Sequence, residues 1–153
     1  MDEEFQRPFA APPTIFLGAL LVSALLEYFV PFDLLPASIE LTLGPLVIIV
    51  GVLLIRSTFR EFKEENTTYD PFDISTNLVT SGVYQYSRNP GYLGLVIIQL
   101  GLAIVLGSIW VALSALVAAL ITSLFVIRLE EKKLADAFGE SYLEYKSKVR
   151  RWF

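Results

Sequence analysis

The sequence SGVYQYSRNPGYLG, residues 81–94, lies where a polar segment meets an apolar run. Pro90 has a fixed φ and no amide hydrogen, and it disfavours helical backbone at Asn89. We therefore predict that a helix begins at about Pro90, a favoured first-turn position. The start of that helix would offer unpaired N–H groups to a carboxylate or phosphate, and Arg88 adds a forked cationic donor. The pattern is typical either of a binding site at a membrane surface or of an interfacial helix cap anchored by Tyr and Arg.

The composition indicates a membrane protein with one domain. Hydrophobic residues make up 54% of the 153 residues, and the mean hydropathy is +0.58. The absence of Cys and His excludes disulfides, thiolate metal sites, zinc catalysis and a Ser–His–Asp triad. The net charge of -4, without a basic arm, argues against a nucleic-acid partner. We therefore predict no metal site, no nucleic-acid partner and close contact with a lipid bilayer.

Four apolar runs predict an all-α integral membrane fold with four transmembrane helices. The first run has about the length needed to cross a hydrocarbon core of about 30 Å. The acidic residues before it are unlike the basic start of a cleavable signal peptide, so we expect it to be retained. Only Gly107 and Ser108 separate the last two runs, which therefore form a tight antiparallel hairpin. The predicted spans are residues 14–32, 41–58, 91–107 and 109–127.

Small and polar residues within the spans predict how the helices pack. Gly44 and Gly51 are seven residues apart and share one helix face, which permits close contact within one subunit or between two. The oligomeric state therefore stays open. Gln99 is the lone amide in the third span, and such a side chain hydrogen-bonds across helices in membranes. Its candidate partners in the fourth span are Ser114, Thr122 and Ser123.

The positions of the basic residues predict the topology. All 12 Lys and Arg residues fall at Arg7, in the segment 56–88, or in the tail 128–153. The positive-inside rule makes the side that carries these segments cytoplasmic. We therefore predict a multi-pass protein of the cell membrane, with both termini, the loop 63–89 and the active site on the cytoplasmic face.

The loop 63–89 and the tail 128–153 are predicted to be ordered. The loop is long and has no strong period, as in functional lids and binding loops, and its aromatic and aliphatic content argues against a disordered linker. The tail places apolar side chains three or four residues apart, the period of an amphipathic helix. Gly139 is predicted to end a first helix, and Ser141 with Glu144 forms a possible capping box for a second. The apolar residues of the tail are Leu134, Phe138, Tyr142, Tyr145, Val149 and Trp152.

An acidic pair, Glu130 and Glu131, follows the fourth span directly. Because the last two spans form a hairpin, this pair is expected to emerge near Arg88 and the start of the third helix. Two carboxylates beside a helix N-terminus suit a zwitterion or a cation. From their spacing alone, the same residues are more typical of a solvated helix start, balanced by the neighbouring Arg128, Lys132 and Lys133.

The segments LVTSGVYQYSRNPGYLG, RLEEKKL and FGESYLEYKSKVRRW occur in this order within a four-span context. The combination resembles the isoprenylcysteine carboxyl methyltransferase and phospholipid methyltransferase superfamily of integral membrane enzymes, over about residues 67–153. The resemblance implies an S-adenosylmethionine-dependent methyltransferase whose cofactor pocket is formed by the loop and the tail helices. The catalytic residues that it implies are Arg88, Asn89 and Glu131. The cofactor-binding residues that it implies are Tyr84, Tyr86, Arg88, Asn89, Pro90, Tyr92, Gly94, Glu130 and Glu131.

The resemblance also gives a hypothesis for each group. The start of the third helix and Arg88 would bind the methionyl carboxylate, while Glu130 or Glu131 would bind the amino group or a ribose hydroxyl. The tyrosines would line the pocket and contact the sulfonium through a ring face. Position 89 holds Asn where eukaryotic carboxyl methyltransferases hold His, and Asn cannot accept a proton near neutral pH.

The acceptor is expected to be small or lipid-like and to carry a carboxylate, thiol or amine. A carboxylate or thiolate needs no base at neutral pH, which favours an acceptor that is already ionised. Two other functions fit the sequence: a nicotinamide-dependent membrane reductase, because sterol reductases resemble this superfamily in their C-terminal half, and a non-catalytic membrane scaffold.

Overall fold

The computed structural model describes residues 11–32, 36–65, 67 and 77–153, and these residues form helices without a β-strand. The continuous helix that begins with α4 passes through a π-helical turn, η2, into α5, and a short 3₁₀ turn, η1, precedes α3. This arrangement confirms the all-α prediction. The elements are α1 (Pro12–Phe29), α2 (Ala37–Glu64), η1 (Gly82–Gln85), α3 (Pro90–Val105), α4 (Ile109–Ile121), η2 (Thr122–Ile127), α5 (Arg128–Phe138) and α6 (Glu140–Lys148).

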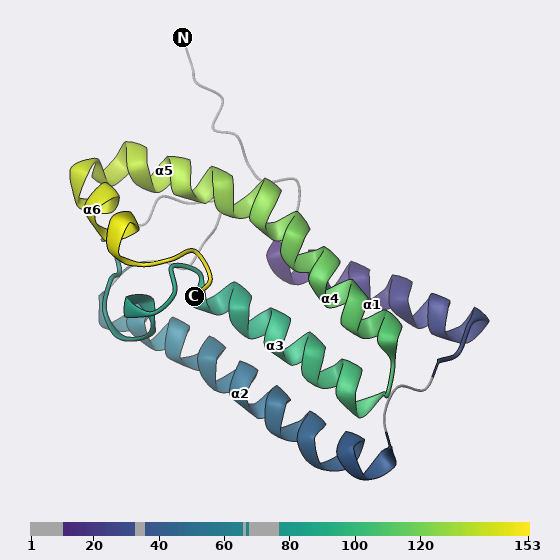
Figure 1. Cartoon of the computed structure of the whole chain (residues 1–153). Helices are drawn as coiled ribbons and strands as arrows, with labels where there is room; N and C mark the ends of the chain where they lie inside the picture. The colour runs from purple at the N-terminus through teal and green to yellow at the C-terminus, as the bar shows by residue number, and fades with distance from the viewer. Residues whose placement is uncertain (1–10, 33–35, 66, 68–76) are drawn as a thin grey trace.

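Among the described residues, three helices are long and apolar enough to cross a membrane: α1, α2 and the continuous helix Ile109–Phe138. The apolar helix α3 has 16 residues, which corresponds to about 24 Å at the α-helical rise, less than a hydrocarbon core of about 30 Å. The chain is thus a helical membrane protein, and the count of four spans stays a prediction. Helix α3 lies between α2 and α4, and α1 packs against α4 (Figure 1).

Glycines bring the backbones of α2 and α3 into contact, as the spacing of Gly44 and Gly51 predicted. A Cβ atom added to Gly51 would lie 2.8 Å from the carbonyl oxygen of Gly94, and one added to Gly44 would lie 3.2 Å from that of Gly101. The close contact that these glycines permit is therefore made within one chain. Across the other face of α3, the Gln99 amide donates a hydrogen bond of 2.7 Å to Ser114 Oγ, one of its three predicted partners.

The end of the bundle farther from the tail is closed by side-chain hydrogen bonds. The Glu27 carboxylate of α1 accepts one from the Ser108 hydroxyl in the α3–α4 turn and another, of 3.0 Å, from the Phe32 N–H. The indole N–H of Trp110 donates to the Val30 carbonyl oxygen at 2.8 Å. These contacts hold the end of α1 against the start of α4.

The polar segments differ in detail from the prediction. Helix α2 continues to Glu64, where Arg60 pairs with Glu64 at 2.9 Å, so residues 63 and 64 belong to the helix rather than to the loop. Residues 66 and 68–76 of that loop lie outside the described residues. Gly139 ends α5 as predicted, with φ +52°. The capping box was wrong: α6 begins at Glu140, directly after the bend, so the Ser141 side chain caps nothing.

Candidate functional site

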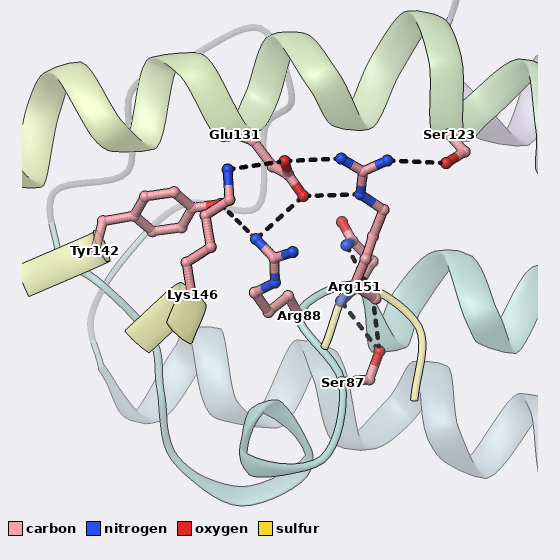
Figure 2. A network of polar contacts seen from close by, with 8 residues as sticks. Ser87, Arg88, Ser123, Glu131, Tyr142, Lys146 and Arg151 are labelled. Atoms are coloured by element: carbon pink, nitrogen blue, oxygen red, sulfur yellow. Dashed lines mark hydrogen bonds and ion pairs between the residues drawn. The ribbon is translucent and has the colours of Figure 1, made fainter. Parts of the chain in front are cut away.

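The polar cluster of the molecule lies where the start of α3 meets α5 and α6 (Figure 2). Arg88 precedes α3, and its Nη1 atom lies 3.1 Å from Oε1 of Glu131 on α5. Both side chains are nearly buried, at 10% and 9% exposed. The hairpin of the last two apolar helices thus brings the acidic pair to Arg88, as the sequence predicted. Helix α3 begins at Pro90, also as predicted, and no side chain of the described residues caps its N-terminus.

Glu131 binds two further cations, both from the tail. The Arg151 guanidinium contacts the two carboxylate oxygens through Nε and Nη2, each at 2.9 Å, the bidentate geometry that makes Arg–carboxylate pairs strong. Nζ of Lys146 lies 3.4 Å from Oε2. Three cations therefore surround one carboxylate, and the cluster carries an excess of positive charge that suits an anionic ligand.

Residues 149–153, which we call the C-terminal strap, cross the start of α3 after α6 ends. The Arg88 N–H donates to the Arg150 carbonyl oxygen at 3.0 Å, and the Asn89 amide donates to the Arg151 carbonyl oxygen at 3.0 Å. The Ser87 hydroxyl is 3.4 Å from the same oxygen. Asn89 thus holds the strap in place, and the strap in turn delivers the Arg151 side chain to Glu131.

The other member of the acidic pair has a different partner. The Tyr92 hydroxyl donates a hydrogen bond to Oε1 of Glu130. Tyr92 is buried against Val126 and Ile127 of the π-helical turn, and Trp152 of the strap packs on the same cluster. Because neighbouring residues point about 100° apart around a helix, Glu130 faces this apolar cluster while Glu131 faces the cations.

Two tail tyrosines enclose the cluster. Arg88 Nη1 donates to the hydroxyl of Tyr142 at 3.2 Å, and Tyr142 is 1% exposed. The Tyr145 hydroxyl donates to the Tyr84 carbonyl oxygen at 2.7 Å. Burial raises the pKa of both phenols, and for Tyr142 the negative charge of Glu131 raises the pKa further. Both side chains therefore stay neutral at physiological pH.

Comparison with known proteins follows the same segments. Residues 39–141, about two thirds of the chain, match the model of the phospholipid methyltransferase family. The chain belongs to this family. The resemblance seen in its motifs is thereby confirmed.

Curated relatives match over shorter stretches. A protein-S-isoprenylcysteine O-methyltransferase of Schizosaccharomyces pombe is 40% identical over 75 residues, which is 47% of this chain and 30% of that protein. The corresponding protein of Xenopus laevis is 39% identical over 77 residues, 49% of this chain and 26% of that protein. An uncharacterized Haemophilus influenzae protein is 39% identical over 61 residues, 40% of this chain and 97% of that protein. The chain thus spans less than a third of the length of the two methyltransferases.

The family match divides the polar cluster. Arg88 and Glu131 lie within the matched residues 39–141, whereas Lys146 and Arg151 follow them. Sequence reasoning missed these two cations, although both lie in the quoted segment FGESYLEYKSKVRRW. The signal was present as basic residues in an amphipathic tail, but only the bend at Gly139 and the strap bring them to Glu131.

The remaining predicted residues of this family member lie around the cluster at different depths. Pro90 is buried at the start of α3. The ring of Tyr84 packs edge-on against Phe62 of α2, with centroids 5.7 Å apart. Tyr86 is 76% exposed, and Gly94 faces α2, where an added Cβ would lie 2.9 Å from the Gly51 carbonyl oxygen. The structure thus gathers Arg88, Asn89, Tyr92 and the acidic pair, while Gly94 serves helix packing.

One donor in the cluster has no partner among the described residues. Nε of Arg88 is buried and makes no hydrogen bond there, and a buried donor left without a partner costs about 1–3 kcal/mol. The N–H groups at the start of α3 lie next to it in sequence and have no side-chain cap. These donors fit the carboxylate of an amino-acid ligand such as the methionyl part of S-adenosylmethionine.

Proposed function

We propose that this member of the phospholipid methyltransferase family is an S-adenosylmethionine-dependent methyltransferase that acts at a membrane surface. The observation that carries the proposal is the buried cluster of Arg88 and Glu131 beside the uncapped start of α3. The names of the relatives support methyl transfer, and they do not favour the nicotinamide-dependent reductase.

The residues of the cluster divide the binding of the donor between them. Bound S-adenosylmethionine would supply a methyl group activated by its sulfonium. Arg88, through its unpartnered Nε, and the N–H groups of α3 bind the methionyl carboxylate. Glu131 binds the amino group or a ribose hydroxyl. Lys146 is the cation best able to give way, because its contact with Glu131 is the longest, at 3.4 Å, and its side chain is 42% exposed.

The apolar and aromatic parts of the site exclude water and orient the acceptor. Methyl transfer from a sulfonium needs an aligned acceptor and a site closed to water. Tyr92 and Tyr142 are buried and form walls of this kind. Asn89 acts as a positioning residue, because its amide is engaged with the strap. Asn89 cannot accept a proton, so an amine acceptor would need a carboxylate of the site as its base. An acceptor that is already ionised, a carboxylate or a thiolate, needs no base and is the one we favour.

We assign the site to the cytoplasmic face of the membrane. The basic residues of the described chain lie at the end of α2, around Arg88 and in the tail from Arg128, and the turn between α3 and α4 at the opposite end has none. The positive-inside rule orients the basic end toward the cytoplasm. Reactivity of single cysteines introduced at Tyr86 and Leu106, in inverted and right-side-out vesicles, tests this orientation.

The decisive experiment is a thermal-shift titration of the purified protein in nanodiscs with S-adenosylmethionine, S-adenosylhomocysteine and reduced nicotinamide cofactor. A ligand at about 100 times its Kd stabilises the fold by about 2.7 kcal/mol. We expect a shift with the first two ligands only. Glu131→Gln should abolish the shift, whereas Glu144→Gln, at an exposed i,i+4 pair with Lys148, should keep it.

The other outcomes separate the alternatives. A shift with the nicotinamide cofactor alone would establish the reductase. A folded protein that responds to none of the three ligands would instead support the non-catalytic scaffold.

A further inference from the structure

Two packed helices limit the thickness of the apolar layer that this chain presents to a membrane. On α2, the uncharged stretch 41–55 lies between Glu40 and Arg56, which are 16 residues apart, or about 24 Å at the helical rise. On α3, the 16 residues Pro90–Val105 are all uncharged and also span about 24 Å. The tilt of a helix only shortens the distance that it covers along the membrane normal. Either helix therefore spans at most about 24 Å of hydrocarbon.

The two helices run side by side, so their ends lie at similar levels. A Cβ atom added to Gly44 would lie 2.9 Å from the Val105 amide nitrogen, and one added to Gly51 would lie 2.8 Å from the Gly94 carbonyl oxygen. These contacts join both halves of the uncharged stretch of α2 to α3. The charges that bound α2 therefore lie within about one helical turn of the two ends of α3.

Helix α1 joins the same two levels over an even shorter path. Its Glu27 carboxylate accepts a hydrogen bond from Ser108 in the α3–α4 turn, whereas its Ile15 packs at the other end with Tyr92 and Val126. Ile15 and Glu27 are 12 residues apart, about 18 Å at the helical rise. The longer apolar helix that begins with α4 crosses this layer at a tilt, the usual way to accommodate excess length.

The exposed side of α2 changes from apolar to basic within one turn. Leu46, Ile49 and Leu53 are exposed, and their spacing of three or four residues puts them on one face of the helix. Arg56 follows three residues after Leu53 and is also exposed. Arg60 extends the same row by another turn. Acyl chains that cover this face therefore meet a guanidinium where an ordinary hydrocarbon core, about 30 Å thick, would still continue.

We propose that the exposed faces of α2 and α3 fit a bilayer of short acyl chains, with a hydrocarbon core about 24 Å thick. An ordinary bilayer has to thin around these helices, because a charged side chain within the core is costly and thinning is a response to a short apolar span. The fit does not depend on the proposed function, since it concerns faces that point away from the polar cluster.

The first test is thermal unfolding, without any ligand, in nanodiscs of dimyristoleoyl, dioleoyl or dierucoyl phosphatidylcholine. We expect the highest Tm in the lipid with the shortest chains and a Tm several degrees lower in the lipid with the longest. Arg56→Leu lengthens the apolar row of α2 by about one turn and should reduce this difference in Tm. The matched control Arg60→Leu removes an arginine from the same row, beyond its apolar part, and should keep the difference.

Spin labels on single cysteines locate the border of the hydrocarbon directly, because the chain has no native cysteine. Labels at Leu53 and Phe59, both exposed, lie on either side of Arg56. In dioleoyl nanodiscs, we expect oxygen to reach the label at Leu53 and a water-soluble nickel chelate to reach the label at Phe59. Phe59 lies about 28 Å along α2 from Glu40, so a core of about 30 Å would instead place its label in hydrocarbon.

Four results would overturn the proposed fit. They are a Phe59 label that only oxygen reaches, a Tm that is constant or rises with chain length, equal effects of Arg56→Leu and Arg60→Leu, and disulfide cross-links between Leu53→Cys chains. The last result would show that a second copy, rather than lipid, covers this face. Donor binding plays no part in these measurements, so any of these results would leave the proposed function intact.

Discussion

Replacing Glu131 by Gln should destabilise the protein strongly, because its carboxylate is the shared ion-pair partner of three cations. Removal of one partner from a buried ion pair costs about 3–5 kcal/mol. Arg88 is 10% exposed and would keep an almost buried, unbalanced charge, whereas the side chains of Arg151 and Lys146 are 30% and 42% exposed and retain water. We therefore expect a loss of about 3 kcal/mol, the low end of that range.

The assay is reversible unfolding in mixed micelles of a mild detergent and dodecyl sulfate, followed by circular dichroism. The matched control is Glu144→Gln on α6, which also removes one carboxylate from a Lys pair but at an exposed position, and it should match the wild type. A double variant that adds Arg88→Met should recover part of the lost stability, since it removes the buried charge that Glu131→Gln leaves without a partner. Equal stability of Glu131→Gln and the control would refute the conclusion that Glu131 stabilises the fold by pairing with the buried charge of Arg88.

Other substitutions test the packing and the tail. Gly51→Ala should lower the free energy of unfolding by about 1–3 kcal/mol through overpacking between α2 and α3. Gly18→Ala, which meets open space, should leave it unchanged or raise it by up to about 1 kcal/mol. A free energy of unfolding that changed in the same direction in both variants would contradict this reasoning. Tyr145→Phe should cost about 1 kcal/mol at neutral pH, the value of one hydrogen bond. Burial raises the pKa of Tyr145 in the folded chain. The contribution of the neutral phenol to stability is therefore complete below pH of about 10 and is lost as the pH rises through the folded-state pKa. At alkaline pH, the free energy of unfolding should fall less steeply with pH in Tyr145→Phe than in the wild type. Gln99→Leu should cost only about 0.6 kcal/mol, and a much larger loss in the same unfolding assay would indicate a role beyond its bond to α4.

The features predicted correctly are those fixed by local chemistry or by chain topology. Pro90 determines where α3 begins, and the short turn of three residues around Gly107 determines that α3 and α4 are antiparallel. Once these are fixed, Glu131 has to emerge near Arg88. The close helix contact at Gly44 and Gly51 was also predicted correctly, because residues seven positions apart lie on the same face of a helix.

The partners of Glu131 in the tail were not predictable in this way. Lys146 and Arg151 reach it only because Gly139 adopts a φ of +52° and turns α6 back toward α3. Glycine permits such a conformation but does not specify which way the following helix runs. The strap adds backbone hydrogen bonds from Arg88 and Asn89, and the periodicity of a sequence carries no signal for contacts of that kind.

The π-helical turn Thr122–Ile127 joins the membrane helix to the site. Ile121, just before it, lines an apolar cavity between α1 and α4, and Ser123 accepts a hydrogen bond of 3.3 Å from Arg151. Val126 packs under Tyr92. The Thr122 hydroxyl is buried and has no partner among the described residues. A π turn is rare and costs hydrogen-bond quality, and it is found frequently at functional sites. Here one continuous helix presents the Ser123 hydroxyl to Arg151 of the strap and the Val126 side chain to Tyr92. A uniform α-helix with the same residues would turn the side chains that follow the π turn, those of α5 included, to other directions.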